Sequence, residues 1–376
     1  MSTVFVGLMS GTSLDGIDAV AADFGDDPTG TRVHVLAHAR QAFAAPLKAE
    51  LLALNCSAGD EIHRSALAAN ALARNYAELV ATVIERAGLG RGDVTAVGCH
   101  GQTVRHRPGE FDGTGYTVQL NAPALLAELS GIDVVADFRS RDVAAGGQGA
   151  PLVPAFHRAM FGRDGASSAV LNLGGIANLT CIDTDGFTLG FDCGPANALL
   201  DLWCASSTGR PYDDGGAWGA TGQVDAGLLA RLLAETYFAR PPPKSTGRDL
   251  FDHHWLDACL HDSGATGRLQ PEDVQSTLAE LTAVTCADAC RRYAGSATEL
   301  VVCGGGAFNV DVMCRLRRLL SPMVVIDSSQ RGLPPEQVEA TAFAWLARAF
   351  LTRRPGNIAS VTGAIGPRVL GAFYPA

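Results

Sequence analysis

Positive charge, paired cysteines and long apolar runs are scarce in this sequence. Its 29 lysine and arginine residues are outnumbered by 39 acidic residues, which gives a formal net charge of −10. A protein that binds along nucleic acid needs a basic face to displace counterions from the phosphates. The composition therefore argues against a nucleic-acid partner.

The cysteines and the apolar segments exclude further classes. No Cys-X-X-Cys pair occurs among the 10 cysteines, so the usual signature of a zinc ribbon or a thioredoxin-type site is missing. No uninterrupted apolar segment reaches the roughly 18 residues of a membrane span, and residues 1–5 do not open a secretory signal. We expect a cytoplasmic protein with reduced thiols and no membrane partner.

Two familiar nucleotide-binding motifs are also absent. Residues 244–246 (KST) follow three prolines instead of the glycine loop of GxxxxGK[ST], and no GxGxxG directly follows a strand-like segment. These absences exclude a P-loop and a Rossmann site. An acidic chain must hold phosphates locally, with backbone N–H groups and helix N-termini, and its 43 glycines favour that arrangement.

Glycine-rich turns between apolar segments are the strongest pattern in the chain. Residues 4–24 are predicted to form a strand, a turn at 10–16 and a second strand. Residues 168–182 repeat this pattern around Gly174 and Gly175. The 376 residues, 47% of them hydrophobic, suffice for about two domains, and the repeated hairpin suggests a duplicated architecture.

A third glycine cluster, residues 304–306, follows a predicted strand at 300–303 and precedes a helical run at 310–320. Consecutive backbone N–H groups in glycine-rich turns can surround phosphate oxygens. Each turn alone would more often be only a tight turn. Three of them, in the order of two phosphate loops and one adenosine loop, match the plan of the actin-like kinases.

The predicted nucleotide-binding residues all lie in these three loops, where serine and threonine hydroxyls of the first loop add hydrogen-bond donors. They are Ser10, Gly11, Thr12, Ser13, Leu14, Asp15, Gly16, Ile17, Asn172, Gly174, Gly175, Asn178, Gly304, Gly305, Gly306 and Asn309.

Residues 7–18 (GLMSGTSLDGID) resemble the opening signature of anhydro-N-acetylmuramic acid kinases. The resemblance continues to the end of the chain, in residues 98–103, 133–139, 149–154, 171–178, 190–195, 302–309, 362–364 and 374–375. It implies an α/β chain of two actin-like ATPase (ribonuclease H-like) domains, with mixed sheets flanked by helices and an interdomain cleft.

We expect domain I, with the first phosphate loop, to comprise residues 1–125 and about 356–376. Domain II, with the second phosphate loop, the catalytic aspartate and the adenosine loop, is expected to comprise residues 126–355. The resemblance implies that ATP phosphorylates O6 of 1,6-anhydro-N-acetylmuramic acid while water opens the anhydro bridge, in cell-wall recycling. This reaction needs a carboxylate that takes a proton from the attacking water.

The catalytic aspartate of the family maps onto Asp192. This residue is predicted to lie between an apolar strand at 187–191 and a turn at 194–195 that precedes a helix at 197–203. A carboxylate at a strand end beside a turn faces a cleft rather than a core. The alternative is an aspartate that caps the helix.

The resemblance assigns Glu339 to the sugar hydroxyls, and the alternative is an exposed glutamate favoured by the helix dipole. Arg139, beside Asp137 and a glycine-rich loop, is expected to clamp the lactyl carboxylate. The alternative is structural ion pairing among Asp137, Arg139, Arg141 and Asp142.

His100 and Gln102 are also assigned to the sugar, although a histidine after a strand is more often a satisfied structural group. ATP implies Mg²⁺, for which Asp15, or else Asp18, is the expected carboxylate. The resemblance makes a homodimer possible.

Two other functions stay open. One is a different actin-like phosphotransferase, such as a polyphosphatase, which would have no use for Glu339. The other is a non-catalytic binding module switched by ATP. ADP release that depends on the sugar separates both from the kinase.

Overall fold

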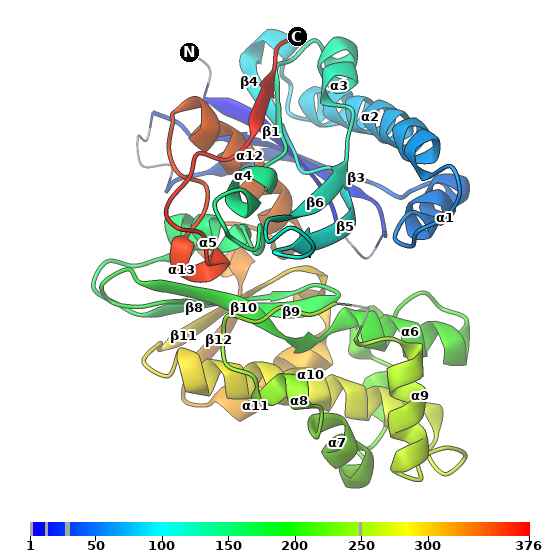
Figure 1. Ribbon diagram of the computed structural model, residues 1–376. Coiled ribbons are helices and arrows are strands. Elements are labelled where there is room, and N and C mark those ends of the chain that lie inside the picture. The colour runs from blue at the N-terminus through cyan, green and yellow to red at the C-terminus, as the bar shows by residue number, and fades with distance from the viewer. Residues whose placement is uncertain (1–2, 12–13, 27–30, 248–249) are drawn as a thin grey trace. The chain divides into compact units, whose positions relative to one another are not determined.

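The computed structural model describes residues 3–11, 14–26, 31–247 and 250–376 (Figure 1). Within this part of the chain, no helix is long and apolar enough to cross a membrane. Strands and helices alternate along most of it, as predicted for an α/β protein.

The chain divides into two compact units. Unit 1 comprises residues 1–160 and 337–376, and unit 2 comprises residues 161–336. Each unit contains one mixed sheet with helices packed against it.

The sheet of unit 1 has six strands in the order β13-β7-β4-β1-β2-β3. Strands β1, β2 and β3 are antiparallel neighbours, β4 and β7 continue from β1 in parallel, and β13 pairs antiparallel with β7. Strands β5 and β6 form a separate hairpin. The bounds are Val4–Ser10 (β1), Ile17–Asp23 (β2), His34–Gln41 (β3), Val94–Cys99 (β4), Gln102–Pro108 (β5), Gly115–Leu120 (β6), Val134–Ala136 (β7) and Ala372–Tyr374 (β13).

The sheet of unit 2 has five strands, and it repeats the order of β3-β2-β1-β4-β7 in unit 1. It reads β10-β9-β8-β11-β12, with three antiparallel strands followed by two parallel ones. Two mixed sheets of matching order, each flanked by helices, confirm the predicted fold class and agree with the suggested duplication. The bounds are Ser168–Leu173 (β8), Ile176–Ile182 (β9), Thr188–Pro195 (β10), Glu299–Cys303 (β11) and Val324–Asp327 (β12).

Helices cover both faces of the unit 1 sheet. Successive side chains of a strand point to opposite faces, so Val6 and Leu8 pack with α2 and α3, whereas Phe5 packs with α12. In unit 2 one apolar cluster joins β8 and β9 to α6, α10 and α11. The helices are Ala45–Ala53 (α1), Glu61–Arg86 (α2), Pro123–Ser130 (α3), Ser140–Val143 (α4), Val153–Phe161 (α5), Asn197–Thr208 (α6), Ala226–Leu233 (α7), Thr236–Ala239 (α8), His253–Asp262 (α9), Pro271–Tyr293 (α10), Val310–Leu320 (α11), Val338–Leu351 (α12) and Ala359–Thr362 (α13).

Two glycines let α12 lie directly on the backbone of the unit 1 sheet. A Cβ atom on Gly7 of β1 would lie 1.9 Å from the carbonyl oxygen of Ala340, and one on Gly98 of β4 would lie 2.0 Å from that of Phe343. Real Cβ atoms do not approach other atoms so closely. The missing side chains therefore set the distance between helix and sheet.

This division differs from the predicted domain boundaries. Residues 126–160 and 337–355 were expected in domain II, but they belong to unit 1. Strand β7 pairs with β4, and α12 rests on Gly7 and Gly98, so both segments complete the first sheet. Unit 2 is instead one continuous stretch of chain.

Candidate active site

The first predicted phosphate loop joins β1 to β2. The Ser10 side chain is buried, and its hydroxyl donates to the Gly101 carbonyl oxygen (3.0 Å) and accepts from the Tyr76 hydroxyl (2.9 Å). It thus holds the loop against α2 and the end of β4 and is not a donor toward a phosphate. Thr12 and Ser13 lie outside the described residues.

Other predicted residues of this loop are also tied to the protein. The carbonyl oxygen of Gly11 accepts from the Leu14 N–H (3.2 Å) and from Nε2 of Gln102 (3.1 Å). Leu14 and Ile17 are buried in the core. A Cβ atom on Gly16 would lie 2.3 Å from the Gln41 carbonyl oxygen. Gln102, assigned to the sugar from the sequence, therefore contacts the first loop.

The second and third glycine loops, which are far apart in the sequence, meet in unit 2. A Cβ atom on Gly304 would lie 2.2 Å from Oδ1 of Asn172, and one on Gly306 would lie 2.6 Å from Cβ of Leu173. Asn197, at the start of α6, donates through Nδ2 to the Leu173 carbonyl oxygen (3.1 Å). Two of the three predicted nucleotide loops thus form one continuous surface beside a helix N-terminus.

A cavity of about 400 Å³ opens beyond the third loop. It lies entirely within unit 2, where the loop leads into α11. The residues that line it are Ala307, Phe308, Asp327, Ser329, Gln330 and Pro335. Its position at the end of the Gly304–Gly306 turn suits a flat ring such as an adenine base.

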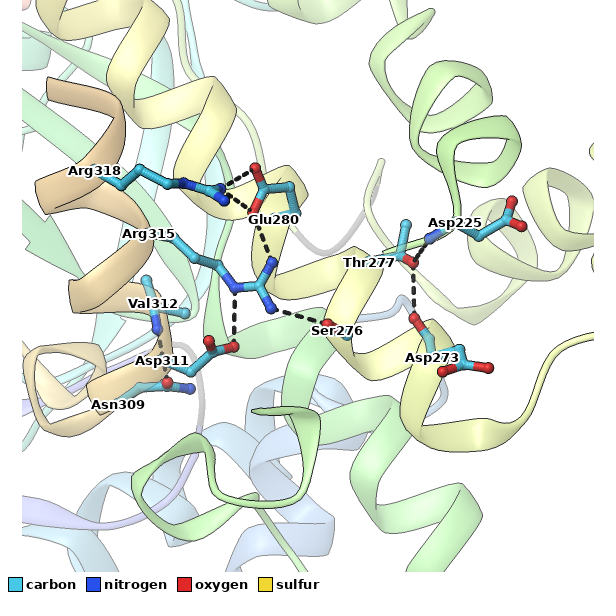
Figure 2. Close-up of polar contacts among 10 residues, drawn as sticks. All are labelled: Asp225, Asp273, Ser276, Thr277, Glu280, Asn309, Asp311, Val312, Arg315 and Arg318. Carbon is cyan, nitrogen blue, oxygen red and sulfur yellow. Dashed lines mark hydrogen bonds and ion pairs between the residues drawn. The ribbon is translucent and has the colours of Figure 1, made fainter. Parts of the chain in front are cut away.

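Asn309, also predicted to bind nucleotide, caps α11. Its Oδ1 accepts from the Val312 N–H (3.0 Å), which satisfies an otherwise unpaired donor at the helix start. The side chain oxygen is therefore committed to the helix. Figure 2 shows Asn309 close to a group of charged side chains on α10 and α11.

That group fixes α11 to α10. Arg315 donates to Oε2 of Glu280 (2.6 Å), to Oδ2 of Asp311 (2.9 Å) and to the Ser276 hydroxyl (2.8 Å), and Arg318 donates to both oxygens of Glu280 (Figure 2). Glu280 and Arg315 are largely buried, with side chains 11% and 12% exposed. The network thus holds the helix that begins directly after the third loop.

Asp192 lies in a row of polar residues that crosses the unit 2 sheet. Asn172 of β8 pairs with Asn178 of β9, which pairs in turn with Asp192 of β10. Side chains of such paired residues lie on the same face, about 5 Å apart. The sheet therefore brings the predicted base beside two predicted nucleotide-binding residues. One of them, Asn172, lies two residues before the Gly174–Gly175 turn.

The strand that carries Asp192 is longer than predicted. β10 continues to Pro195, with a register shift between Asp192 and Gly194 that leaves Cys193 unpaired in the ladder. β10 is an edge strand, where proline is tolerated. The helix-capping alternative is wrong, because α6 begins after Ala196 and has no side-chain cap.

Burial raises the pKa of Asp192 from its ordinary value of 3.8 to about 6. Two groups oppose this rise: the Thr246 N–H, which donates to Oδ2 (3.0 Å), and the charge of Lys244. A carboxylate with a pKa slightly below neutral is ionised at pH 7 and still basic enough to accept a proton.

The sugar-binding residues predicted from the sequence all lie in unit 1. Arg139 donates from Nε (3.0 Å) and Nη2 (2.9 Å) to Nε2 of His100, and from Nη1 (2.7 Å) to the Gly149 carbonyl oxygen. Burial and the charge of Arg139 hold the pKa of His100 well below its usual range, so this histidine is neutral. The guanidinium edge expected to clamp a carboxylate is thus occupied by His100.

Glu339 lies in the first turn of α12, half-buried, and its charge raises the pKa of Arg139 against the larger effect of burial. Asp137 is exposed and has a left-handed backbone (φ 57°). Within the described part of the chain no ion pair joins Asp137, Arg139, Arg141 and Asp142, although the charge of Asp142 raises the pKa of Arg139. The ion-pairing alternative for these charges therefore stays a prediction.

A model of the anhydro-N-acetylmuramic acid kinase family matches residues 3–376. The chain belongs to this family. A protein of that name from Variovorax paradoxus (strain S110) is 59% identical over 378 residues, covering 99% of each chain. One from Cupriavidus metallidurans (strain CH34) is 56% identical over 377 residues, covering 100% of this chain and 98% of its own. Members of the family thus match this chain over its full length.

Among solved structures, the activator of the 2-hydroxyisocaproyl-CoA dehydratase from Clostridium difficile, with bound ADPNP, aligns with 93% of this chain and 97% of its own. Its sequence identity is 13% and its TM-score is 0.49.

Sequence reasoning about this anhydro-N-acetylmuramic acid kinase family member missed the residues that surround Asp192. The Asp192 N–H donates to the Lys244 carbonyl oxygen (3.2 Å), and the Tyr237 hydroxyl donates to the Asp192 carbonyl oxygen (2.8 Å). Lys244 and Thr246 follow a proline run that the sequence presents only as a stiff connection. No local sequence pattern predicts contacts between residues about 50 positions apart.

Asp142 was also missed as a structural residue. Fully buried, it accepts from Nδ2 of Asn357 (2.6 Å), from the Thr362 hydroxyl (2.8 Å) and from the Gly149 N–H (2.8 Å). It thereby ties the glycine-rich loop after Arg139 to the C-terminal part of unit 1. The signal in the sequence was an aspartate beside that loop, which we considered only as a member of a structural ion pair.

Proposed function

We propose that this chain uses ATP to phosphorylate O6 of 1,6-anhydro-N-acetylmuramic acid while water opens the anhydro bridge. The products are N-acetylmuramic acid 6-phosphate and ADP, and the setting is murein recycling in the cytoplasm. The observation that carries the proposal is the row Asn172–Asn178–Asp192 beside two glycine loops. The full-length family match supports the choice of sugar.

Asp192 acts as the general base in this proposal. Its carboxylate takes a proton from water as the water oxygen bonds to the anomeric carbon and the bond from that carbon to the bridge oxygen breaks. The bridge oxygen, which becomes O6, forms the bond to the γ-phosphorus, and ADP leaves. With a pKa of about 6, Asp192 is about 90% ionised at pH 7. A phosphoryl group thus takes the place of the proton that an inverting glycosidase would supply.

The phosphates of ATP are assigned to the backbone of the first and second loops, and the adenosine to the Gly304–Gly306 turn and the cavity beyond it. The clustered carbonyl and N–H groups around Asn197 support this assignment. Since the Ser10 hydroxyl is engaged within the protein, we assign only its backbone to the nucleotide.

The sugar is assigned to Glu339, Asp137 and the His100–Arg139 pair, with Gln102 acting through the first loop. A neutral His100 held by Arg139 presents a fixed ring to a hydroxyl. Glu339 offers a half-buried carboxylate that accepts hydroxyl hydrogen bonds, and its charge raises the pKa of the nearby Arg139.

The donor set around Asp15 fits hydrated Mg²⁺. Its carboxylate is half-exposed, and its Oδ1 lies 3.9 Å from Nζ of Lys48, a contact weak enough to yield to a cation. Asp18 fits less well, because His38 (3.0 Å) and Arg40 (4.0 Å) occupy its two oxygens. When bound, Mg²⁺ neutralises charge on the phosphates. The homodimer stays a prediction, which light scattering measures.

The test is ADP formation with ATP and Mg²⁺, with and without the anhydro sugar, combined with identification of the sugar product. We expect sugar-dependent ADP and the 6-phosphate in equal amounts. Asp192→Asn should lower kcat about 1,000-fold, since general base catalysis contributes about 100- to 10,000-fold. Asp183→Asn, at an exposed position in the turn between β9 and β10, is the matched control and should keep wild-type activity.

Two results contradict the proposal. ADP release that does not depend on the sugar would favour another actin-like phosphotransferase or an ATP-switched module. Full activity of Asp192→Asn would remove the assigned base.

A further inference from the structure

A short segment, Lys244–Thr246, runs beside the strand that carries Asp192. The Asp192 N–H donates to the Lys244 carbonyl oxygen (3.2 Å), and the Thr246 N–H donates to Oδ2 of Asp192 (3.0 Å). β10 is the edge strand of its sheet, and this segment occupies its outer side at Asp192. Both the backbone and the side chain of the proposed base are therefore held from one short segment.

The ammonium group of Lys244 is fixed beside the base by several contacts. Its Nζ lies 3.3 Å from the carbonyl oxygens of Tyr237 and Phe238, to which it donates, and 4.6 Å from the centre of the Tyr237 ring. It also lies 5.9 Å from the ring of Phe191, the residue before Asp192. The Tyr237 hydroxyl in turn donates to the Asp192 carbonyl oxygen (2.8 Å). Tyr237 thus contacts both the ammonium group of Lys244 and the backbone of Asp192.

Other titratable groups also face this site. Cys193 follows Asp192 and, like Asp192, raises the pKa of Lys244, whereas burial, which is the largest effect, and the charges of Arg292 and Arg240 lower it. The guanidinium carbon of Arg240 lies 5.9 Å from the centre of the Tyr237 ring, on an exposed side chain. Lys244 is the one charged side chain among these that acts on Asp192 itself.

Lysine is rare in this chain. Of its 29 lysine and arginine residues, two are lysines, Lys48 and Lys244. Lys244 is therefore the single lysine of unit 2. An ammonium group is a compact point charge on a flexible stem, whereas a guanidinium group is a wide planar fork. A compact cation fits between two backbone carbonyl groups and an aromatic face.

We propose that Lys244 is a positioning residue that keeps Asp192 ionised and oriented for proton abstraction from water. The inference rests on the proposed role of Asp192 as the base. Burial in the unit 2 sheet favours the protonated carboxyl group, which cannot accept a proton. The Thr246 N–H and the Lys244 charge oppose that effect, and removal of the charge leaves burial less opposed.

The test is the pH dependence of kcat/KM for the anhydro sugar at saturating ATP, which reports the ionisation of the enzyme–ATP complex before the sugar binds. The variants are Lys244→Met, which removes the charge, and Lys244→Arg, which keeps it. We expect the acidic limb of Lys244→Met to move up by about one pH unit, because a nearby opposite charge lowers a carboxyl pKa by about 1–3 units. With a wild-type midpoint of about 6, this is a loss of about fivefold at pH 6 and almost none at pH 9.

Lys244→Arg should keep its acidic limb near that of the wild type, even if the larger group lowers activity at every pH. Arg240→Met is the matched control, because it removes an exposed positive charge beside the same tyrosine ring. Its acidic limb should not move. If Lys244→Met cannot be purified in folded form, Lys244→Gln tests the same loss of charge.

Three results overturn the inference. The acidic limb of Lys244→Met could coincide with that of the wild type, or its activity could fall equally at all pH values, which marks a purely structural role. In either case sugar-dependent ADP formation by the wild type leaves the proposed function intact. Absence of that activity from the wild type at every pH removes both proposals together.

Discussion

The two sheets of this protein share one strand order but fix their helices in different ways. In unit 1, Gly7 and Gly98 leave bare backbone, and α12 lies directly on it. In unit 2, the central strands β8 and β11 contain no glycine, and α11 is held to α10 by the ion pairs of Glu280 and Arg315 (Figure 2).

The difference shows two physical routes by which a helix can be held in a fixed position. Close backbone packing is rigid because a single added methyl group has no space. A buried ion-pair network is directional, but each member depends on the others for its charge to be compensated. Glu339 depends on the first route, since it lies on α12, and Asn309 depends on the second, since it begins α11.

The largest effect is expected from Gly98→Ala. The new Cβ would lie 2.0 Å from the Phe343 carbonyl oxygen, so α12 must shift away from the sheet. We expect a loss of about 3 kcal/mol or more in the free energy of unfolding, which is at the upper end of overpacking costs. Chemical denaturation monitored by circular dichroism measures it.

Gly59→Ala is the control for this substitution, because nothing lies within 4 Å of a Cβ atom there and its φ is ordinary. Its free energy of unfolding should change by less than about 0.5 kcal/mol. Equal stability of the Gly98 and Gly59 variants would show that α12 does not depend on contact with the backbone.

A smaller loss is expected from Glu280→Ala in unit 2. This change leaves the largely buried Arg315 with Asp311 and Ser276 as its remaining partners. We expect a loss of about 2–3 kcal/mol, below the cost of a fully uncompensated buried charge. Urea denaturation at pH 7 measures it.

Arg318→Ala is the comparison within the same network. Its side chain is 63% exposed, so loss of its pair with Glu280 should cost less than about 1 kcal/mol. If both variants lose the same stability, burial does not determine the strength of this network.

The only gain in stability is expected from Asp192→Asn. Because the folded-state pKa of about 6 exceeds the ordinary value of 3.8, the folded protein loses stability as the pH rises from about 4 to 6, and the whole loss persists above pH 6. The variant should therefore be more stable than the wild type by about 3 kcal/mol at pH 8. The difference should vanish below about pH 4.

Unfolding curves of both proteins between pH 4 and pH 8 measure this gain, and Asp183→Asn should show none. A variant that is less stable than the wild type at pH 8 would contradict the cost assigned to the ionised base.

Local signals in the sequence predicted much of this architecture. The glycine turn between apolar runs at 168–182 gives the bounds of β8 and β9, and the helical period at 310–320 gives those of α11. These elements are determined by neighbours in the chain. The predicted end of β10 was wrong, because Gly194 and Pro195 are typical of a turn. An edge strand tolerates both residues.

The missed features depend on contacts between distant residues. Ser10 is a reasonable phosphate donor until the fold places Tyr76 beside it, 66 positions away. Lys244 and Thr246 reach Asp192 only because the chain returns to the edge of β10. The boundary errors have the same origin, since no local pattern shows that α12 needs Gly7 and Gly98 beneath it.

The split of unit 1 between the two ends of the chain has a consequence for synthesis on the ribosome. Unit 2 is one continuous stretch, residues 161–336, so all of its strands are available once that stretch has emerged. Unit 1 begins first but lacks α12 and β13 until the last 40 residues, 337–376, have been translated. Domains fold as units during translation. The half of the protein that starts first is therefore the half that finishes last.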